Sequence, residues 1–321
     1  MIVSASRRTD IPAFYSEWLL NRLRAGFVLV QNPRNPGRYS RIALGPEIVD
    51  CIVFWTKNPA PMLGKLDLIR EMGYPFYFQF TLTPYGQAIE GGLPPKAEIL
   101  ETFKKLSAMI GPERVVWRYD PVILGGALDV AYHRDRFGRL AAALDGYANR
   151  CVFSFVDFYP GGCSRALKKM AGREAGSEDI YRVAECFSEI AGKHRMRLSA
   201  CSEPAQLSRY GISRASCIDK GMIEALVGCT IRAKKDRGQR PACGCVESID
   251  IGAYGTCAHG CIYCYASYGP NAAKSVGHCH DPCSPALTGA PDRAAVISNR
   301  MVRSLKETQT VLDEKAGFMR I

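Results

Sequence analysis

Several features are absent from this 321-residue chain, and each absence excludes a class of protein. No stretch approaches the roughly 20 consecutive apolar residues that a membrane-spanning helix needs. The opening sequence, MIVSASRRTD, has neither the apolar core of a signal peptide nor the pattern of a transit sequence. No internal repeat, low-complexity tract or interdomain linker is visible. We therefore expect a cytoplasmic protein with no membrane partner, folded as one domain over residues 1–321.

The chain also lacks the excess of polar residues that marks disorder. Hydrophobic residues make up 47% and charged residues 23%, with a mean hydropathy of -0.09, so a full core can form. The formal net charge of +11 suggests an anionic partner, and nucleic acid is one candidate. Lys and Arg are spread along the whole chain, however, so a solvated basic surface is the simpler interpretation.

Cysteine is scarce in the first 200 residues and concentrated after them. Four of the 14 cysteines lie before Cys201, and the other ten lie between Cys201 and Cys283. Disulfides are rare in the reducing cytoplasm, where closely spaced cysteines more often bind metal. The pattern predicts that the metal chemistry belongs to a cysteine-rich region over residues 201–290.

Short runs rich in β-branched and aromatic residues alternate with longer segments of helical periodicity, which is typical of βαβ units and a parallel sheet. Eight such runs occur, the number of strands in a TIM-like (β/α)8 barrel, so we expect this α/β fold. Prolines break the connection over residues 31–46, which predicts a turn or hairpin there. The expected strands are Ile2–Ala5, Phe27–Val30, Cys51–Trp55, Phe76–Phe80, Arg114–Trp117, Cys151–Phe155, Met196–Ser199 and Val246–Asp250. The expected helices include Phe14–Leu23, Ile99–Met109, Phe137–Tyr147, Ile180–Ile190 and, as the last, Arg293–Leu312.

Polar and charged residues follow most of the expected strands. Because barrel active sites collect at the carboxyl ends of the strands, these residues predict one cup-shaped pocket for a cofactor and a substrate. Ordinary turn and helix-capping roles are the alternative for any one of them. The candidates for cofactor binding are Arg7, Arg8, Asp10, Lys57, Arg118 and Asp120.

Three cysteines near the C-terminus, Cys257, Cys261 and Cys264, are separated by three and then by two residues. A loop with this spacing can hold three corners of a 4Fe-4S cluster and leave the fourth iron open to an exogenous ligand. Zinc is the alternative, since its cysteine ligands are also spaced by about two to four residues. We favour the cluster.

This loop, with Tyr263 before its last cysteine, resembles the signature of radical S-adenosylmethionine (SAM) enzymes, and it is similar to that of spore photoproduct lyase-like members. Across nearly its full length, with motifs such as Phe54–Pro59, Trp117–Pro121 and Asp250–Gly252, the chain resembles an uncharacterised bacterial family with a C-terminal cysteine cluster. The radical SAM resemblance implies an enzyme that generates a 5'-deoxyadenosyl radical and acts on an unknown substrate. It also implies an electron donor such as flavodoxin or ferredoxin.

The order of the chain differs from that of radical SAM barrels, in which the cluster loop follows the first strand. Here the loop follows the expected eighth strand, Val246–Asp250. A closed barrel has no geometric first strand, so a circular permutation would bring the loop to the same place. Ile2–Ala5 would then correspond to the second strand, whose end holds the SAM amino group. No Gly-Gly-Glu motif occurs there, and Asp10 is the candidate carboxylate, with helix capping as its alternative.

Four further cysteines, Cys201, Cys217, Cys243 and Cys245, predict a second metal site. Four thiolates complete either an auxiliary 4Fe-4S cluster, which we favour, or an all-cysteine zinc site. The alternative is a set of reduced, half-buried thiols.

Two other classes of function are alternatives to the radical SAM-like enzyme. A non-catalytic metalloprotein would use the cysteines to staple the C-terminal region onto the barrel or to sense redox state. A nucleic-acid repair or modification factor is suggested by the photoproduct lyase-like loop and the net charge of +11. Salt-dependent binding to DNA or RNA would distinguish this last class.

Overall fold

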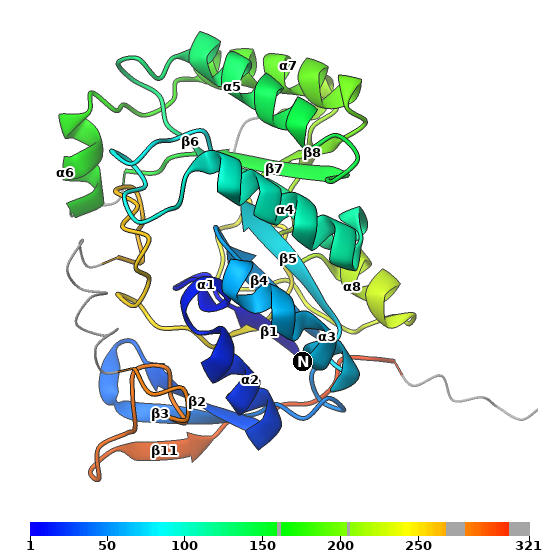
Figure 1. Cartoon of the computed structure of the whole chain (residues 1–321), viewed down its shortest axis with the longest axis vertical. Coiled ribbons are helices and arrows are strands. Elements are labelled where there is room, and N and C mark those ends of the chain that lie inside the picture. Colours follow the sequence, from blue (N-terminus) through cyan, green and yellow to red (C-terminus); the bar gives the residue numbers. More distant parts are fainter. Residues whose placement is uncertain (159–161, 204–205, 268–279, 308–321) are drawn as a thin grey trace, which may run out of the picture.

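The structure is a computed structural model, and it describes residues 1–158, 162–203, 206–267 and 280–307. Its largest element is a sheet of eight strands in the order β10-β1-β4-β5-β6-β7-β8-β9 (Figure 1), in which all neighbours are parallel. Apolar runs form these strands because both faces of the sheet are covered. The strands are β1 (Ile2–Ala5), β4 (Cys51–Thr56), β5 (Phe76–Thr81), β6 (Val115–Val122), β7 (Arg150–Phe155), β8 (Arg197–Ala200), β9 (Ser213–Arg214) and β10 (Ile249–Asp250).

The expected TIM-like barrel is not confirmed, because the sheet is open. Among the described residues, the edge strands β9 and β10 do not pair with each other, and each has only two residues. Helix α8 (Lys220–Val227) lies between them in the chain and packs Met222 and Ile223 among the side chains of the inner face, such as Val53 and Tyr77. A closed barrel fills this space with side chains from its opposite strands. Here α8 occupies it.

The run Phe27–Val30 forms a strand, but in a second sheet. Strands β2 (Phe27–Asn32) and β3 (Asn35–Ala43) are an antiparallel hairpin, in agreement with the turn expected in this connection. Strand β11 (Val296–Asn299) pairs with β3 in parallel, and the three-stranded sheet lies at the bottom of the view in Figure 1. The large sheet therefore reaches eight strands by including β9, which the sequence analysis does not predict.

The prediction of a helix over Arg293–Leu312 is wrong for residues 293–307, which the structure describes. The segment carries β11, in which the β-branched Val296 and Ile297 extend along Arg38 and Tyr39 of β3. Tertiary pairing overrides the helical periodicity here. Residues 308–312 of the expected helix lie outside the described residues.

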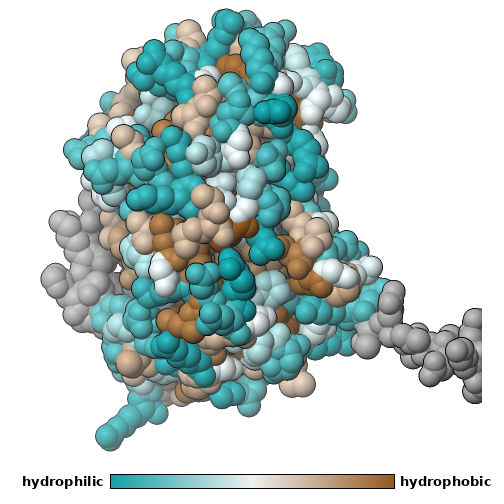
Figure 2. All heavy atoms as spheres, turned by 45° about the vertical axis from the view of Figure 1, so that its right-hand side comes forward, coloured by the Kyte–Doolittle hydropathy of each residue, from teal (hydrophilic) through white to brown (hydrophobic). Residues whose placement is uncertain are grey.

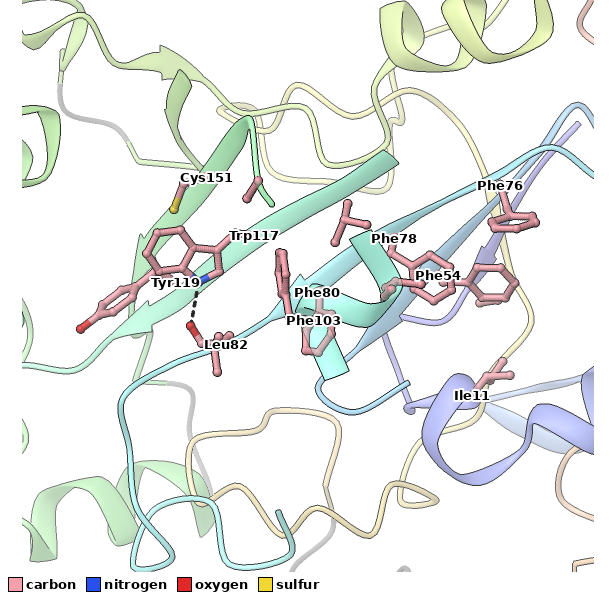
Figure 3. Packing of buried hydrophobic residues seen from close by; sticks show 14 of the residues in the cluster. Ile11, Phe54, Phe76, Phe78, Phe80, Leu82, Phe103, Trp117, Tyr119 and Cys151 are labelled. Carbon is pink, nitrogen blue, oxygen red and sulfur yellow. Dashed lines mark hydrogen bonds between the residues drawn. The ribbon is translucent and has the colours of Figure 1, made fainter. Parts of the chain in front are cut away.

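Helices cover the outer face of the large sheet, and the other four expected helical segments are confirmed with shifted ends. Aromatic residues fill the contact between helices and sheet. Phe103 of α4 (Lys96–Ile110) lies 4.8 Å from Phe80 between ring centroids. Trp117 Nε1 donates to the Leu82 carbonyl at 2.9 Å (Figure 3). The helices are α1 (Ile11–Phe14), α2 (Ser16–Ala25), α3 (Leu66–Glu71), α4 (Lys96–Ile110), α5 (Val130–Ala143), α6 (Gly162–Lys169) and α7 (Ser177–Lys193).

The surface carries few large apolar groups. In the face shown in Figure 2, hydrophilic side chains predominate and apolar side chains are exposed in small, separate groups. Isolated groups of this kind are ordinary on folded proteins. Within the described residues, none of the helices has both the length and the apolar character needed to cross a bilayer.

Phe137→Ala tests the packing between the helices and the outer face of the large sheet. The Phe137 ring stacks on Phe187 at 3.9 Å and on Trp117 at 4.9 Å between centroids, and all three side chains are fully buried. We expect the free energy of unfolding, measured in urea, to fall by about 3–5 kcal/mol, because the truncation leaves a cavity. Met109→Ala, which shortens a side chain that is 41% exposed on α4, should change it by less than about 0.5 kcal/mol. Equal losses in the two variants would contradict the placement of Phe137.

Candidate functional site

One cavity of about 320 Å³ lies where the strands of the large sheet end. Residues at or just after the ends of β1, β4, β5, β6, β7 and β8 form its wall together with the loop after β10. The six expected cofactor-binding residues and the seven expected metal ligands all line this cavity. They are Arg7, Arg8, Asp10, Lys57, Arg118 and Asp120, and Cys201, Cys217, Cys243, Cys245, Cys257, Cys261 and Cys264.

Strand β10 brings the cysteine loop to this end of the sheet. Ile249 pairs in parallel with Val3 of β1, so the chain that follows β10 emerges beside the chain that follows β1. The Asp250 carboxylate ties the two together, since it accepts hydrogen bonds from Ser6 Oγ at 2.6 Å and from the Arg7 amide at 2.8 Å. The segment after β10 is gold in Figure 1 and lies on the left of the view. The chain after β10 and the chain after β1 thus leave the sheet side by side.

A buried carboxylate fixes the other side of the loop. Glu90 Oε1 accepts hydrogen bonds from Lys57 Nζ at 2.7 Å and from Thr83 Oγ1 at 2.8 Å. Tyr263 of the cysteine loop also donates to this oxygen, and Lys96 pairs with the other one. Burial alone raises the pKa of Glu90, but Lys57 and Lys96 outweigh burial and hold the pKa at about 2. Glu90 therefore remains a carboxylate, a role that no local motif in the sequence indicates.

Backbone contacts complete the attachment of the cysteine loop. The Gly92 amide donates to the His259 carbonyl at 2.8 Å, and the Ile262 amide donates to the Ile89 carbonyl at 3.0 Å. A Cβ on Gly92 would lie 2.4 Å from the Ala258 carbonyl oxygen, so only glycine fits this approach.

Two thiols of the loop, those of Cys257 and Cys261, are held in the neutral form when no metal is bound. Burial raises the pKa of Cys261 to about 12, although the nearby Lys57 opposes this effect. Burial also raises the pKa of Cys257. Because metals bind thiolates, loading of this site must release protons.

The four upstream thiols form a connected group. The Sγ atoms of Cys201 and Cys217 are 3.8 Å apart, and hydrogen bonds from Cys217 and Cys243 lower the pKa of Cys245. Arg118 Nη1 donates to Cys217 Sγ at 2.7 Å. The second cysteine set is thus assembled from segments before and after α8.

The arrangement of these groups bears on the kind of metal. In the part of the chain that the structure describes, no three Cys, His, Asp or Glu side chains are grouped as a single bound metal ion requires. A 4Fe-4S cluster places its thiolates on separate iron atoms, so the spacing needed for one ion does not test a cluster.

Asp10 has two structural roles. Its Oδ1 caps α1 by accepting from the Ala13 amide at 2.9 Å, and its Oδ2 accepts from the Lys57 amide and from His259 Nε2, both at 2.7 Å. These three bonds leave Asp10 little capacity to hold the amino group of SAM. His259 itself lies within the cysteine loop and lines the cavity, and its buried Nδ1 has no partner among the described residues. His259 is not among the expected site residues, although its place between Cys257 and Cys261 is a signal.

Two arginines of the wall are already engaged. Arg118 pairs with Asp120 besides bonding to Cys217. Burial alone lowers the pKa of Arg118, but Cys217 and Asp120 raise it well above the ordinary value. Arg8 lies over the Tyr254 ring at 5.1 Å.

The profile of a protein family described as a domain of unknown function (DUF1848) matches residues 2–266. The chain belongs to this family. The match spans the large sheet and both cysteine sets up to Ala266. Comparison of the DUF1848 chain with curated proteins and with solved structures returns no match.

Gly92→Ala tests how the cysteine loop is held. The new Cβ would collide with the Ala258 and His259 carbonyls, so the loop must shift. We expect faster alkylation of Cys257, Cys261 and Cys264 by iodoacetamide, measured by mass spectrometry under reducing conditions. Gly86→Ala is the matched control, since a Cβ there meets no atom within 4 Å. Parental alkylation rates in Gly92→Ala would contradict the contact.

Glu90 should contribute to stability in a pH-dependent way. Its pKa falls from the ordinary 4.5 to about 2 on folding, so its contribution is complete above pH 4.5 and is lost as the pH falls toward 2. Glu90→Gln should remove this part of the acid sensitivity. At neutral pH it should lower the free energy of unfolding by about 3–5 kcal/mol, because Lys57 and Lys96 lose their counter-charge.

Urea denaturation over a series of pH values measures both effects of Glu90→Gln. Glu101→Gln, at a side chain that is 61% exposed on α4, is the control and should follow the parent. An unchanged acid profile in Glu90→Gln would show that another group is responsible.

Proposed function

We propose that this DUF1848 protein is an iron-sulfur enzyme of the radical SAM type, with a 4Fe-4S cluster on Cys257, Cys261 and Cys264. One observation carries the proposal: these three thiols line the same cavity as the polar ends of β1, β4 and β6. A substrate held among those ends would face the cysteine loop.

The cavity has the character of a ligand site. Its volume of about 320 Å³ lies at the lower end of the range of roughly 300–1,000 Å³ typical of ligand pockets. Four buried polar atoms of its wall have no hydrogen-bond partner among the residues that the structure describes. They are Arg7 Nη2, Thr9 Oγ1, Trp55 Nε1 and His259 Nδ1. Because buried polar groups are nearly always satisfied, these atoms favour a polar group that occupies the cavity.

The residues of the cavity wall would have different roles. Cys257, Cys261 and Cys264 would hold the cluster, which when bound supplies the electron that cleaves SAM. Lys57 would offset the thiolate charge at Cys261: burial lowers its pKa, but Glu90 and Cys261 raise it above the ordinary value. Strand ends would orient the substrate, and the packed interior beneath them excludes water from one side.

A specific distance favours zinc as the second candidate at Cys201, Cys217, Cys243 and Cys245. With Zn–S bonds of about 2.3 Å, the sulfurs of a tetrahedral site lie about 3.8 Å apart. The Sγ atoms of Cys201 and Cys217 have this separation. Closure around one ion would require the other two thiols to move, since no group of three is arranged for a single ion among the described residues. Metal analysis of the variants below decides between zinc and an auxiliary cluster.

The proposed chemistry requires an electron donor such as flavodoxin or ferredoxin. It also suits the reducing cytoplasm, which we propose as the compartment. The twelve cysteines whose side chains are described are all free thiols. Such a number of free thiols persists in a reducing environment.

Replacing Cys257, Cys261 and Cys264 together with Ala should remove about four irons per chain after anaerobic reconstitution with iron and sulfide. The fold should survive, as judged by circular dichroism. Cys186→Ala, at a half-buried thiol on α7 outside the cavity, is the matched control and should keep its iron. Full iron content in the triple variant would show that this assignment is wrong.

The same preparations test the second cysteine set. Replacement of Cys243 and Cys245 with Ala should lower the melting temperature, because metal ligation there ties the chain on either side of α8 together. Loss of zinc identifies a zinc site, and loss of about four further irons identifies an auxiliary cluster. Parental metal content and melting temperature would leave these cysteines as ordinary thiols and contradict the second site.

The reconstituted parent protein should convert SAM to 5'-deoxyadenosine in the presence of dithionite, measured by liquid chromatography. SAM should also change the EPR signal of the reduced cluster. A cluster that forms but neither cleaves SAM nor responds to it would support a non-catalytic iron-sulfur protein and contradict the proposed enzyme.

A further inference from the structure

Two neighbouring donors in the wall of the cavity have no hydrogen-bond partner in the described part of the chain. They are Arg7 Nη2 and Trp55 Nε1, both buried. The Arg7 guanidinium lies 5.2 Å from the centroid of the Trp55 indole, so the two side chains are neighbours in the wall. Guanidinium and indole N–H groups donate hydrogen bonds and accept none. The group that satisfies them must therefore be an acceptor.

The charge of the wall selects an anionic acceptor. Five basic side chains line the cavity (Arg7, Arg8, Lys57, Arg118 and Arg240) and three acidic ones do (Asp10, Asp120 and Asp157). Cys245, whose pKa is lowered, offsets part of this excess. Arg7 is itself a cation, however, so its Nη2 binds an anion more strongly than it binds a neutral acceptor such as water.

Arg7 is less tightly paired than Lys57 and Arg118 are. Burial alone lowers the pKa of Arg7, but Cys245 and Asp250 lie near enough to raise it. Lys57 is bound to Glu90 at 2.7 Å, and Arg118 is bound to Asp120 and Cys217. By contrast, the nearest carboxylate oxygen to the Arg7 side chain, on Asp236, is 3.8 Å from Nη1, which exceeds hydrogen-bond distance.

Hydrogen bonds fix the backbone of Arg7, while its Nη2 atom remains available to a ligand. The amide of Arg7 donates to Asp250 at 2.8 Å, and its carbonyl accepts from Tyr265 at 3.1 Å. Both contacts anchor Arg7 between β10 and the cysteine loop. Pre-organisation of this kind lowers the entropic cost of binding a ligand.

We propose that Arg7 and Trp55 form a subsite for an oxyanion, a carboxylate or a phosphate group, of the substrate that occupies this cavity. Thr9, whose buried Oγ1 is also without a partner in the same wall, supplies a further donor. The inference deepens the proposed function by naming the substrate class. It rests on that function only in calling the ligand a substrate, since binding of the anion requires neither a cluster nor SAM cleavage.

Trp55 provides its own signal for the test. The chain has three tryptophans, and Trp18 and Trp117 are fully buried, with their Nε1 atoms bonded to the Ser284 and Leu82 carbonyls. A ligand in the cavity should therefore change the fluorescence of Trp55 and leave that of the other two unchanged. The full chain is titrated with inorganic phosphate and, separately, with acetate, at constant ionic strength balanced with chloride. Calorimetry gives a second, independent reading.

We expect saturable binding of at least one of the two anions, and the anion that binds identifies the group as phosphate or carboxylate. Arg7→Gln should weaken binding about tenfold to a hundredfold, the range expected for loss of one charge-assisted hydrogen bond. Trp55→Phe keeps an aromatic ring, removes the N–H donor and should weaken binding about tenfold. Calorimetry alone measures this variant, because it lacks the fluorescence of Trp55. Arg139→Gln removes the same charge from a side chain that is 71% exposed on α5 and should bind as the parent does.

Three outcomes would overturn the subsite. The first is the absence of saturable binding of both anions by the folded parent chain, and the second is equal binding by Arg7→Gln and the parent. The third is binding that disappears once iron and sulfide are loaded, which would assign the two donors to the metal group. If SAM alone binds in an Arg7-dependent way, the oxyanion is the carboxylate of SAM and the assignment to a substrate fails. Iron content and 5'-deoxyadenosine formation report on the proposed function separately.

Discussion

The carboxylate of Asp250 is the contact on which the candidate site depends. It accepts hydrogen bonds from Ser4 Oγ at 2.9 Å, Ser6 Oγ at 2.6 Å, the Arg7 amide at 2.8 Å and the Gly252 amide at 3.0 Å. A strand of two residues has few ladder bonds of its own, so these side-chain bonds do much to hold β10 beside β1. A Cβ on Gly252 would lie 2.1 Å from Ser6 Oγ, which shows how closely the two segments approach. Because of this attachment, the cysteine loop faces the carboxyl ends of β1 and β4.

Charge balance within the cavity determines what the cavity can hold. Burial raises the pKa of the Cys257 and Cys261 thiols, hydrogen bonds from Cys217 and Cys243 lower the pKa of Cys245, and thiolates around a metal would add negative charge. Lys57 and Arg118 lie beside the two cysteine sets, where they can offset that charge. Part of the basic excess of this chain therefore lies in a pocket and does not belong to the solvated surface. Glu90 keeps Lys57 in place and is itself stabilised as a carboxylate by Lys57 and Lys96.

Helix α8 links the interior of the open sheet to the candidate site. The inner face of the sheet is packed with apolar side chains, and α8 contributes Met222 and Ile223 to that packing. Tyr77 and Gln79 of β5 reach across this interior and donate to the Cys217 carbonyl, each at 2.8 Å. Cys217 lies just before α8 in the chain. These bonds therefore place one thiol of the second cysteine set beside the helix that fills the interior. Stability of the inner core and geometry of the site are coupled through this short stretch of chain.

The sequence by itself determined the alternation of strands and helices, the hairpin after Phe27 and thirteen of the residues that line the cavity. These features follow from local periodicity, from proline and from the rule that polar residues at the ends of parallel strands share one edge. Only the tertiary structure decided that the sheet stays open, because strand closure depends on what fills the interior, and α8 competes for that space. Likewise, Glu90, His259 and Trp55 join the site through contacts across more than 30 residues of chain, for example between Lys57 and Glu90 or between Asp10 and His259. No local pattern encodes such contacts, since a buried carboxylate or an unpartnered ring nitrogen is defined by its surroundings and not by its neighbours in sequence.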